Sequence, residues 1–361
     1  MSSVQNFNAG PAKLPTSVLE KVQSELRDYH GSGMSIMEMS HRSPEFEEIN
    51  TRAEKTFKRL LGVDDGYRVL FLQGGASTQF AMVPMNLLPP GAVADFLVTG
   101  SWGEKAYEEV SAMGGAHLAA STKDNAYRSV PSSDQIKLSE NPAYVHLTSN
   151  ETIQGVQWPN FPDLGDRHVV ADMSSDILSR PFDAGKFSLI YAGAQKNLGP
   201  AGVTVVLIRE SWLQNANKGV PTMLRYSTHI KNNSLYNTPP TFAIYVLDLV
   251  LQWIDGLGGL EGMASRNARK AKTLYDAIDG SGGFYRGHAE PSCRSSMNVT
   301  FRIANEALEK PFIKEAQAAG MVGLAGHRSV GGIRASIYNA IEEQACLTLA
   351  EFLGDFARRN G

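Results

Sequence analysis

Runs of apolar residues alternate with longer amphipathic stretches through most of the chain. Within each run the apolar residues are continuous, as in YRVLFL (67–72), a pattern typical of strands buried on both faces of a sheet. Amphipathic stretches such as WGEKAYEEVSAMG (102–114) predict helices. Strands separated by helices predict a mainly parallel sheet with right-handed crossovers, and hence an α/β fold. The expected strands are 67–72, 94–100, 143–149, 168–174, 187–193 and 203–209, with helices at 76–88 and 102–114 between the first three.

The pattern changes in the last third of the chain. A long helix is expected over 240–255, and the glycines of GLGG (256–259) end it. The residues that follow predict a charged helix, two strands with a helix between them and a final helix, which together make a smaller α+β domain. These elements are expected at 260–279, 297–303, 304–319, 333–338 and 340–358.

Composition narrows the class of protein. A chain of 361 residues with 42% hydrophobic residues suits two domains with a large core. No uninterrupted apolar run approaches the ~20 residues that cross a bilayer, and the N-terminal residues lack the pattern of a secretory signal. A net charge of -3 argues against nucleic acid as the main partner. Two cysteines, Cys293 and Cys346, indicate no disulfide framework, so we expect a cytoplasmic protein.

Glycines and hydroxyl residues follow the first predicted strand. Ligands of open parallel sheets bind beyond the carboxyl ends of the strands, so residues at this edge are candidates for a site. In QGGASTQ, Gly74 and Gly75 free the backbone just before a helix begins, and such a helix terminus binds anions such as phosphate. A plain helix cap by Ser77 or Thr78 explains the same residues equally well.

Four further side chains are expected at the same edge of the sheet. Trp102, Thr152, Asp172 and Lys196 each follow a different predicted strand. Singly, each has an ordinary explanation, because tryptophan fills cores, aspartate caps helices and lysine lies on surfaces. Together they match pyridoxal phosphate, which needs a lysine for its Schiff base, a carboxylate for its pyridine nitrogen and a helix terminus for its phosphate.

Long motifs extend from about residue 6 to the last helix. They are NFNAGPAKLP, SHRSPEF, LQGGASTQF, NETIQG, YAGAQKNLGPAG, NTPPTFAIY and GHRSVGGIRASIYNA. In these motifs and in their order the chain resembles the phosphoserine aminotransferases, which are class-V, fold-type I pyridoxal-phosphate enzymes. The resemblance implies a large domain (16–258) with a mainly parallel seven-stranded sheet flanked by helices. It also implies a smaller α+β C-terminal domain (259–361) and an N-terminal segment (1–15) that packs with this smaller domain.

The resemblance implies a set of cofactor-binding residues. Lys196 matches the family's Schiff-base lysine, Asp172 the partner of the pyridinium nitrogen, and Trp102 the residue that stacks on the ring. The other matches are the backbone of Ala76 and Ser77 at the phosphate, Thr152 and Gln195 beside the ring hydroxyl and phosphate, and Asn237 and Thr238. In the family this last pair reaches the cofactor phosphate of the other subunit, so a homodimer with shared active sites and one pyridoxal 5'-phosphate per subunit is expected.

A second implied set binds the anions of the substrate. It comprises His41, Arg42, His327, Arg328 and Arg334. Some members of the family carry an arginine at the position of Ser77, assigned to the substrate phosphate, so here the two His-Arg pairs are left as phosphate receptors. The implied reaction moves an amino group between L-glutamate and 3-phosphohydroxypyruvate, giving O-phospho-L-serine and 2-oxoglutarate, with a side activity in vitamin B6 synthesis.

Three alternatives stay open at this point. A serine- or alanine-glyoxylate aminotransferase of the same fold uses substrates without a second anion, which leaves the basic residues of SHR and GHR without a task. A cysteine desulfurase needs a mobile nucleophilic cysteine, for which Cys293 is the candidate. A non-catalytic protein with this fold has no need of the lysine, the acid and the aromatic plate together.

Overall fold

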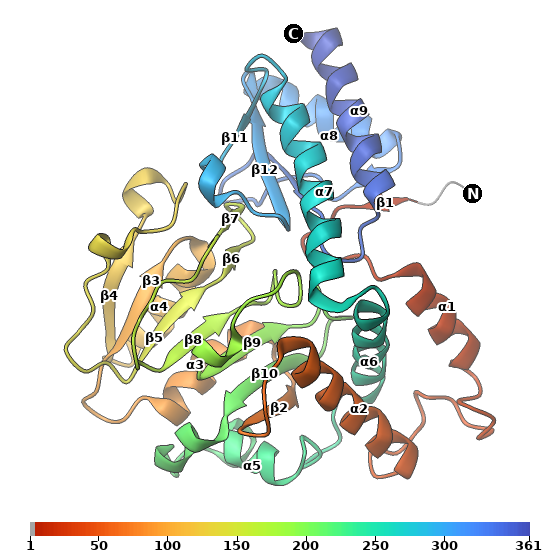
Figure 1. Ribbon diagram of the computed structural model, residues 1–361. Helices are drawn as coiled ribbons and strands as arrows, with labels where there is room; N and C mark the ends of the chain where they lie inside the picture. The colour runs from red at the N-terminus through yellow and green to blue at the C-terminus, as the bar shows by residue number, and fades with distance from the viewer. Residues whose placement is uncertain (1–3) are drawn as a thin grey trace.

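The computed structural model describes residues 4–361, and a seven-stranded sheet lies at the centre of its larger part (Figure 1). The strand order is β2-β10-β9-β8-β5-β3-β4. β10 is antiparallel to both of its neighbours, and the other four pairs are parallel. The predicted α/β fold with a mainly parallel sheet is therefore confirmed. The strands are β2 (Tyr67–Leu72), β3 (Ala94–Val98), β4 (Ala116–Ser121), β5 (Tyr144–Thr148), β8 (Val169–Asp172), β9 (Leu189–Gly193) and β10 (Thr204–Arg209).

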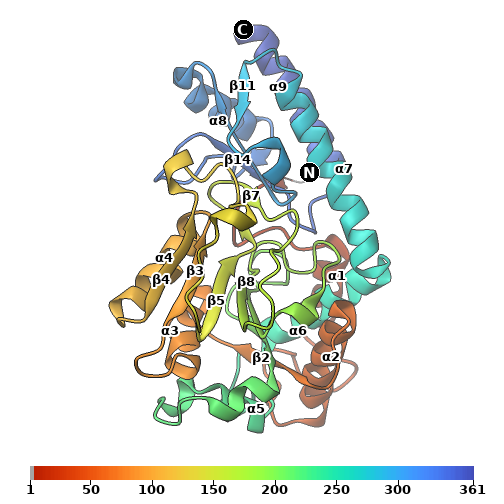
Figure 2. The ribbon, with the colours of Figure 1, turned by 60° about the vertical axis from the view of Figure 1, so that its left-hand side comes forward.

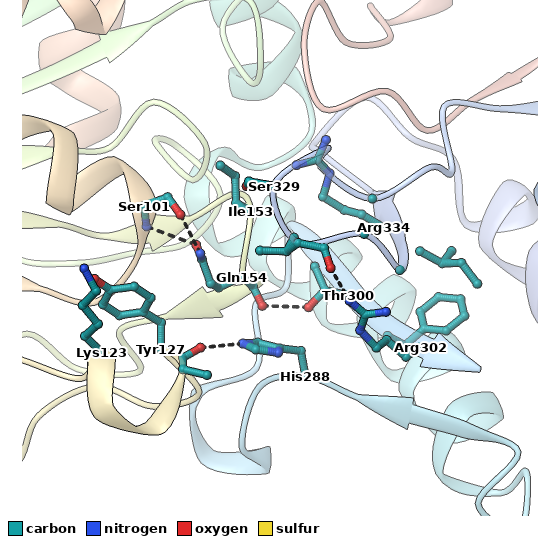
Figure 3. Close-up of a pocket in the computed structure, with 17 residues that line it drawn as sticks. Ser101, Lys123, Tyr127, Ile153, Gln154, His288, Thr300, Arg302, Ser329 and Arg334 are labelled. Atoms are coloured by element: carbon teal, nitrogen blue, oxygen red, sulfur yellow. Dashed lines mark hydrogen bonds between the residues drawn. The ribbon is translucent and has the colours of Figure 1, made fainter. Parts of the chain in front are cut away.

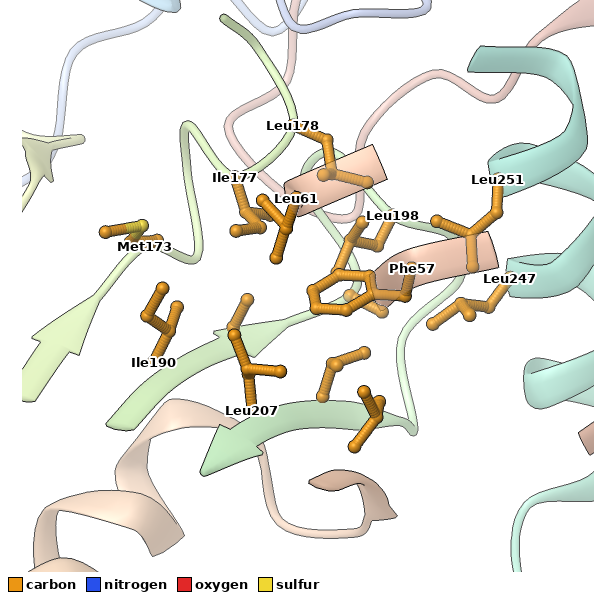
Figure 4. Close-up of a cluster of buried hydrophobic side chains, with 14 of the residues drawn as sticks. Phe57, Leu61, Met173, Ile177, Leu178, Ile190, Leu198, Leu207, Leu247 and Leu251 are labelled. Atoms are coloured by element: carbon orange, nitrogen blue, oxygen red, sulfur yellow. The ribbon is translucent and has the colours of Figure 1, made fainter. Parts of the chain in front are cut away.

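Helices cover both faces of this sheet (Figures 1 and 2). Successive residues of β9 point to different cores: Leu189 and Tyr191 pack with α3 (Gly75–Leu87) and α4 (Ser101–Ala112), whereas Ile190 and Ala192 pack with the core on the other face. Both faces of the strand are therefore buried, which explains the continuous apolar runs in the sequence. The second core contains Phe57, Leu207, Leu247 and Leu251 (Figure 4) and lies under α1 (Thr16–Glu25), α2 (Pro44–Leu61) and α6 (Thr241–Gly256).

The structure has one strand that the sequence does not predict, and two expected elements have other limits, for local reasons. The edge strand β4 has no counterpart in the sequence prediction, because a half-exposed strand lacks a continuous apolar run. β8 ends at Asp172 rather than at residue 174, because the Asp172 carboxylate accepts a hydrogen bond from the Ser174 N–H at 2.9 Å and turns the chain. α8 begins at Glu309 rather than at residue 304, because the Asn305 side chain accepts from the Ala307 N–H and holds a short 3-10 turn.

The C-terminal part of the chain has its own sheet and core. β11 (Tyr285–Gly287), β12 (Asn298–Ile303) and β14 (Ile333–Ser336) form an antiparallel sheet beside α7 (Gly259–Asp279), α8 (Glu309–Ala318) and α9 (Glu343–Asn360). β1 (Gln5–Asn6) pairs with β13 (Met321–Val322), and Phe7 is buried in the core of this part. The domain boundaries proposed above stay a prediction.

Among the described residues no single helix has the length and apolar composition to cross a membrane. Helices α6 and α7 have that length and composition only when they are taken together, and they are bent by 83° where they meet.

Buried asparagines connect the two parts beside Lys196. The Asn339 N–H donates to Asn197 Oδ1 at 3.0 Å, and Asn267 Nδ2 donates to Asn339 Oδ1 at 2.8 Å. Farther along the junction, Asn150 Nδ2 donates to Asn298 Oδ1 at 2.8 Å. Hydrogen bonds between fully buried amides must break together if the parts separate, so the smaller part is held in a fixed position next to the lysine.

Lys270 of α7 is completely buried near the same junction, with 0% of its surface exposed. Its Nζ donates to the carbonyl oxygens of Ile337 at 2.8 Å and Tyr338 at 2.7 Å. Burial, with a smaller contribution from the positive charge of Arg266, lowers the pKa of Lys270 to about 7. An unfolded lysine has a pKa of about 10.4, so between about pH 7 and pH 10 the unfolded chain binds more protons and the unfolding free energy rises with pH.

Lys270→Met should remove this dependence. We expect the melting temperature of the wild type to rise relative to that of the variant as pH increases from about 7 to about 10, and the difference to be constant below that window. Thermal scans of both proteins over this pH range measure it. Lys272→Met, at an exposed lysine of the same helix paired with Asp276, is the control. A wild-type–variant difference that does not change between pH 7 and pH 10 would contradict the assignment.

Candidate active site

The carboxyl ends of six strands lie along one edge of the large sheet. β2 and β9 are both antiparallel to β10, so they are parallel to each other, and Thr204 of β10 lies opposite both Leu72 and Gly193. Asp172 at the end of β8 lies between Thr148 of β5 and Tyr191 of β9. The loops that follow these strands therefore open onto the same edge, as the sequence predicts.

Lys196 lies in the turn after β9 and points toward the turn that follows β5. Its Nζ donates to Thr152 Oγ1 at 2.7 Å and lies 5.4 Å from the centre of the Trp102 ring. Burial lowers the pKa of Lys196, while the carboxylates of Asp172 and Glu151 oppose the shift. The lysine, the hydroxyl and the aromatic plate predicted from different strands are thus in contact.

Asp172 is the buried acid of this group, with 5% of its surface exposed. Burial raises the pKa of the Asp172 carboxyl, and the ammonium of Lys196 opposes that shift. Its Oδ1 accepts from the Ser174 N–H, which orients the carboxylate at the strand end. A buried carboxylate with few hydrogen bonds requires a positively charged or proton-donating partner.

The first turn of α3 is an uncapped helix terminus. Gly74 precedes it with φ 93° and Gly75 follows with φ 66°, conformations that favour glycine. No side chain of the described residues caps this end, and Thr78 Oγ1 instead donates back to the Gly74 carbonyl at 2.9 Å. The cap by Ser77 or Thr78 that the sequence left open is therefore not formed. The backbone N–H groups of Ala76 and Ser77 stand in this turn and suit a phosphate group.

Trp102 opens α4 and is partly buried at the edge of a hydrophobic core. Its Nε1 is buried and makes no hydrogen bond to any described residue. Lys105 Nζ lies 4.5 Å from the centre of the same ring. The indole therefore adjoins Lys196 and does not only fill the core.

Three of the predicted anion-binding residues lie in the C-terminal part. Arg334 of β14 donates from Nη1 to the Thr152 carbonyl at 3.3 Å, and its buried Nε has no partner among the described residues. His327 Nδ1 lies 2.7 Å from Ser329 Oγ. Burial lowers the pKa of His327, and the charges of Arg334, Arg328 and then Lys105 lower it further, so these cations surround one small region.

A cavity of about 510 Å³ extends from Arg334 (Figure 3). Ile153 and Gln154 line one wall, and Ser101 adjoins them at the start of α4. The loop from Ser329 to Gly332 also lines it. The cavity reaches Arg334, whose guanidinium donates to the Thr152 carbonyl, and is large enough for a small substrate.

Four predicted residues are not joined to this group by any hydrogen bond or ion pair of the described chain. His41 and Arg42 lie in the turn before α2, where His41 Nε2 is buried without a partner and Arg42 is exposed. Asn237 and Thr238 lie in the loop before α6, where Asn237 Nδ2 donates to the Thr238 carbonyl. Gln195 contributes its carbonyl, which accepts from the Ala12 N–H at 2.9 Å.

The sequence prediction missed Glu151, which is fully buried, with 0% of its surface exposed. Burial raises the pKa of Glu151 to about 7, although the backbone N–H groups of Gly103 and Trp102 lower it. The available signal was an acid directly after a buried strand, the same signal that identified Asp172. In NETIQG the sequence prediction assigns a site role to the neighbouring Thr152 instead.

These residues fit pyridoxal phosphate. An uncapped helix terminus lies at the sheet edge, where the Ala76 nitrogen is close to Gly193 at the end of β9. The buried acid and the lysine are the chemical partners that the ring nitrogen and the aldehyde need. The buried N–H groups of Arg334 Nε and Trp102 Nε1 have no hydrogen-bond acceptor among the described residues, so both can donate to a ligand.

Comparisons with known proteins agree with this arrangement. The family model of class-V aminotransferases matches residues 4–346. The phosphoserine aminotransferase of Herpetosiphon aurantiacus is 61% identical over 359 residues, which cover 99% of this chain and 100% of that relative. The phosphoserine aminotransferase of Bacillus subtilis is 52% identical over 360 residues, 100% of both chains.

Solved structures give the same result. Phosphoserine aminotransferase from Bacillus circulans subsp. alkalophilus superposes with a TM-score of 0.98 at 55% identity and covers 100% of both chains. The pyridoxal-phosphate-bound enzyme from Trichomonas vaginalis has a TM-score of 0.93 at 37% identity, over 97% of this chain and 99% of its own. Given a family model over nearly the whole chain and full-length relatives at 52% and 61% identity, this chain belongs to the class-V aminotransferase family, among its phosphoserine aminotransferases.

Proposed function

We propose that this chain transfers an amino group between L-glutamate and 3-phosphohydroxypyruvate, giving 2-oxoglutarate and O-phospho-L-serine in serine biosynthesis. The observation that carries the proposal is the hydrogen bond from Lys196 Nζ to Thr152 Oγ1 beside the Trp102 ring. It supports this proposal because burial lowers the pKa of Lys196, and a pyridoxal-phosphate aminotransferase needs a lysine as its base. The membership of the family supplies the reaction type.

Bound pyridoxal phosphate supplies an electrophilic carbon and a ring that takes up electrons from the substrate α-carbon. The backbone N–H groups of Ala76 and Ser77 bind its phosphate, and Trp102 lies against its ring. Asp172 keeps a proton on the ring nitrogen. A buried carboxylate suits that task, because its negative charge stabilises the positive charge of the protonated ring nitrogen, as the charge of Lys196 stabilises the carboxylate itself.

Lys196 acts as the proton shuttle. Its Nζ would take the proton from the substrate α-carbon and pass it to the cofactor carbon within the same half-reaction. A free lysine is protonated at neutral pH, so a base must have a lowered pKa, and burial lowers that of Lys196. Thr152 Oγ1, 2.7 Å from Nζ, keeps the amine directed at the site.

The two anions of the substrate bind to different groups. Arg334 presents a planar fork that can hold the α-carboxylate with two parallel hydrogen bonds. His327 and Arg328, together with His41 and Arg42, receive the substrate phosphate or the γ-carboxylate of glutamate. The cations gathered around His327 support this second pocket.

The alternatives have less support. A glyoxylate-type aminotransferase would not need the second cluster of cations, and the alanine–glyoxylate aminotransferase of Nostoc shares only the fold, at 17% identity. Cys293, the candidate nucleophile of a desulfurase, is buried against Val156 and Ala289 in a short 3-10 turn rather than placed on a mobile loop.

The active site is proposed to be shared between two subunits of a cytoplasmic homodimer. Asn237 and Thr238 precede α6 and have no hydrogen bond to Lys196 or Asp172 among the described residues, and the buried Nε2 of His41 has no hydrogen-bond partner among them. Residues with these roles but without a place in their own site are expected to serve the site of a second copy.

Lys196→Ala should abolish transamination and leave the fold intact, because its Nζ provides chemistry while its neighbours Ala194 and Leu198 provide the packing. Peptide mapping after borohydride reduction of the wild type should find the pyridoxyl group on Lys196. Circular dichroism of the variant checks the fold. Attachment to Lys105 or Lys186 would refute the assignment.

Substitutions of the arginines should separate the two anion sites. Loss of a desolvated charge-assisted contact costs ~1.5–3 kcal/mol, about ten- to a hundredfold in kcat/KM. Arg334→Ala should weaken phosphoserine, glutamate and alanine alike, whereas Arg42→Ala and Arg328→Ala should weaken phosphoserine and glutamate but not alanine. Arg358→Ala, at an exposed arginine of α9, is the control. An unchanged phosphoserine-over-alanine preference in both Arg42→Ala and Arg328→Ala would favour the glyoxylate-type reading.

Mixed dimers should test the shared site. Lys196→Ala lacks the base, and Asn237→Ala combined with Thr238→Ala lacks the proposed cross-subunit contacts, so each homodimer should have low activity. Subunits exchanged between the two should form dimers with one complete site and recover activity. Sedimentation measures the assembly. Full activity in a monomer, or no recovery in verified mixed dimers, would contradict the shared site.

A further inference from the structure

The buried carboxylate of Glu151, at the end of the short strand β6 (Asn150–Glu151), binds the N-terminus of α4. Glu151 Oε2 accepts from the Trp102 N–H at 3.0 Å, and Oε1 accepts from the Gly103 N–H at 2.9 Å. The residue before the helix is Gly100, which has no side chain to cap it. The first turn that carries the indole is therefore capped by a residue far away in the sequence, through charge-assisted hydrogen bonds aligned with the helix dipole.

The glycines around this carboxylate leave room for it. A Cβ at Gly100 would overlap the carboxyl group of Glu151, and one at Gly103 would lie 3.1 Å from its Oε1. Gly100 has an extended backbone that other residues adopt freely, so conformation does not explain the glycine. The close approach of Glu151 does.

The residues that follow Glu151 also form hydrogen bonds with Lys196 and with Ser101, the first residue of α4. Thr152, the next residue, accepts from Lys196 Nζ. Gln154 exchanges two hydrogen bonds with Ser101, from Nε2 to Oγ at 2.7 Å and from the Ser101 N–H to Oε1 at 3.3 Å (Figure 3). Three residues of one short segment thus connect the start of α4 to the lysine.

We propose that Glu151 is a positioning residue that fixes the Trp102 indole relative to Lys196, and thereby sets the plane of the bound ring. It does so through the backbone of α4 and without touching the substrate. The inference rests on the proposed stacking of the pyridoxal-phosphate ring on Trp102.

Glu151→Gln keeps the size of the side chain but replaces one acceptor with an N–H₂ group that faces a backbone N–H. We expect the dissociation constant of pyridoxal phosphate, measured by equilibrium dialysis on the apoenzyme, to rise about tenfold. The visible circular dichroism band of the bound cofactor should change in amplitude, and kcat should fall more than the KM for glutamate rises. A loss of global stability alone would not alter that band.

Glu104→Gln is the matched control. Glu104 lies in the same first turn of α4, but its carboxylate is paired with Lys123 and does not bind the N–H of Trp102 or Gly103. The control should keep the cofactor affinity and the dichroism band of the wild type. If Glu151→Gln behaves like this control, the proposal is wrong.

A double-mutant cycle with Trp102→Ala tests whether Glu151 acts through the indole. The effect of Glu151→Gln on cofactor affinity should nearly vanish in the Trp102→Ala background, and a fully additive effect would overturn the proposal. If Trp102→Ala alone leaves affinity and dichroism unchanged, the proposed stacking fails instead, which separates the two failures.

Gly100→Ala provides a second route if Glu151→Gln does not fold. The added methyl group overlaps the Glu151 carboxyl group and therefore displaces it, and the net charge does not change. The same rise in the dissociation constant and the same change of the band are expected. Wild-type values in Gly100→Ala would refute the proposal.

Discussion

The site depends on the burial of one ammonium group. Lys196 has to be desolvated to lose its proton near neutral pH, yet a desolvated charge is costly unless its surroundings compensate. The structure surrounds it with the Thr152 hydroxyl, the carboxylates of Asp172 and Glu151, and an aromatic face. Glu151 and Thr152 follow β5, Asp172 ends β8 and Trp102 follows β3, so the parallel sheet is what brings the compensation together.

The same requirement explains which parts of the site could be predicted from the sequence. Residues that directly follow apolar runs, such as Asp172 and Lys196, were found because a strand end fixes their position along the sheet edge. The uncapped state of α3 could not be found, because Ser77 and Thr78 have the composition of a cap and only the direction of the Thr78 hydroxyl decides the matter. The position of Glu151 after a buried strand is visible in the sequence, but its hydrogen bonds from the Trp102 and Gly103 N–H groups are not, because the sequence does not distinguish backbone groups.

The fold was predictable where burial is two-sided and unpredictable where it is not. β9 carries apolar side chains on both faces, and its limits agree closely with the apolar run. In the edge strand β4 only Ala119 and Ala120 are buried, so pairing with β3 and not composition makes it a strand. The antiparallel course of β10 is also a tertiary property, since its apolar residues are the same for either direction.

The N-terminal segment places a limit on the order in which the chain can become complete. Gly10 packs against the side chain of Lys196, and the segment is fixed at its other side by the pairing of β1 with β13 and by the hydrogen bond from the Tyr338 hydroxyl to the Ala9 carbonyl. Ala9 thus depends on a partner 329 positions later in the chain. One wall of the lysine pocket closes only after Tyr338 has been synthesised, so a nascent chain that ends before this residue has no complete pocket to load.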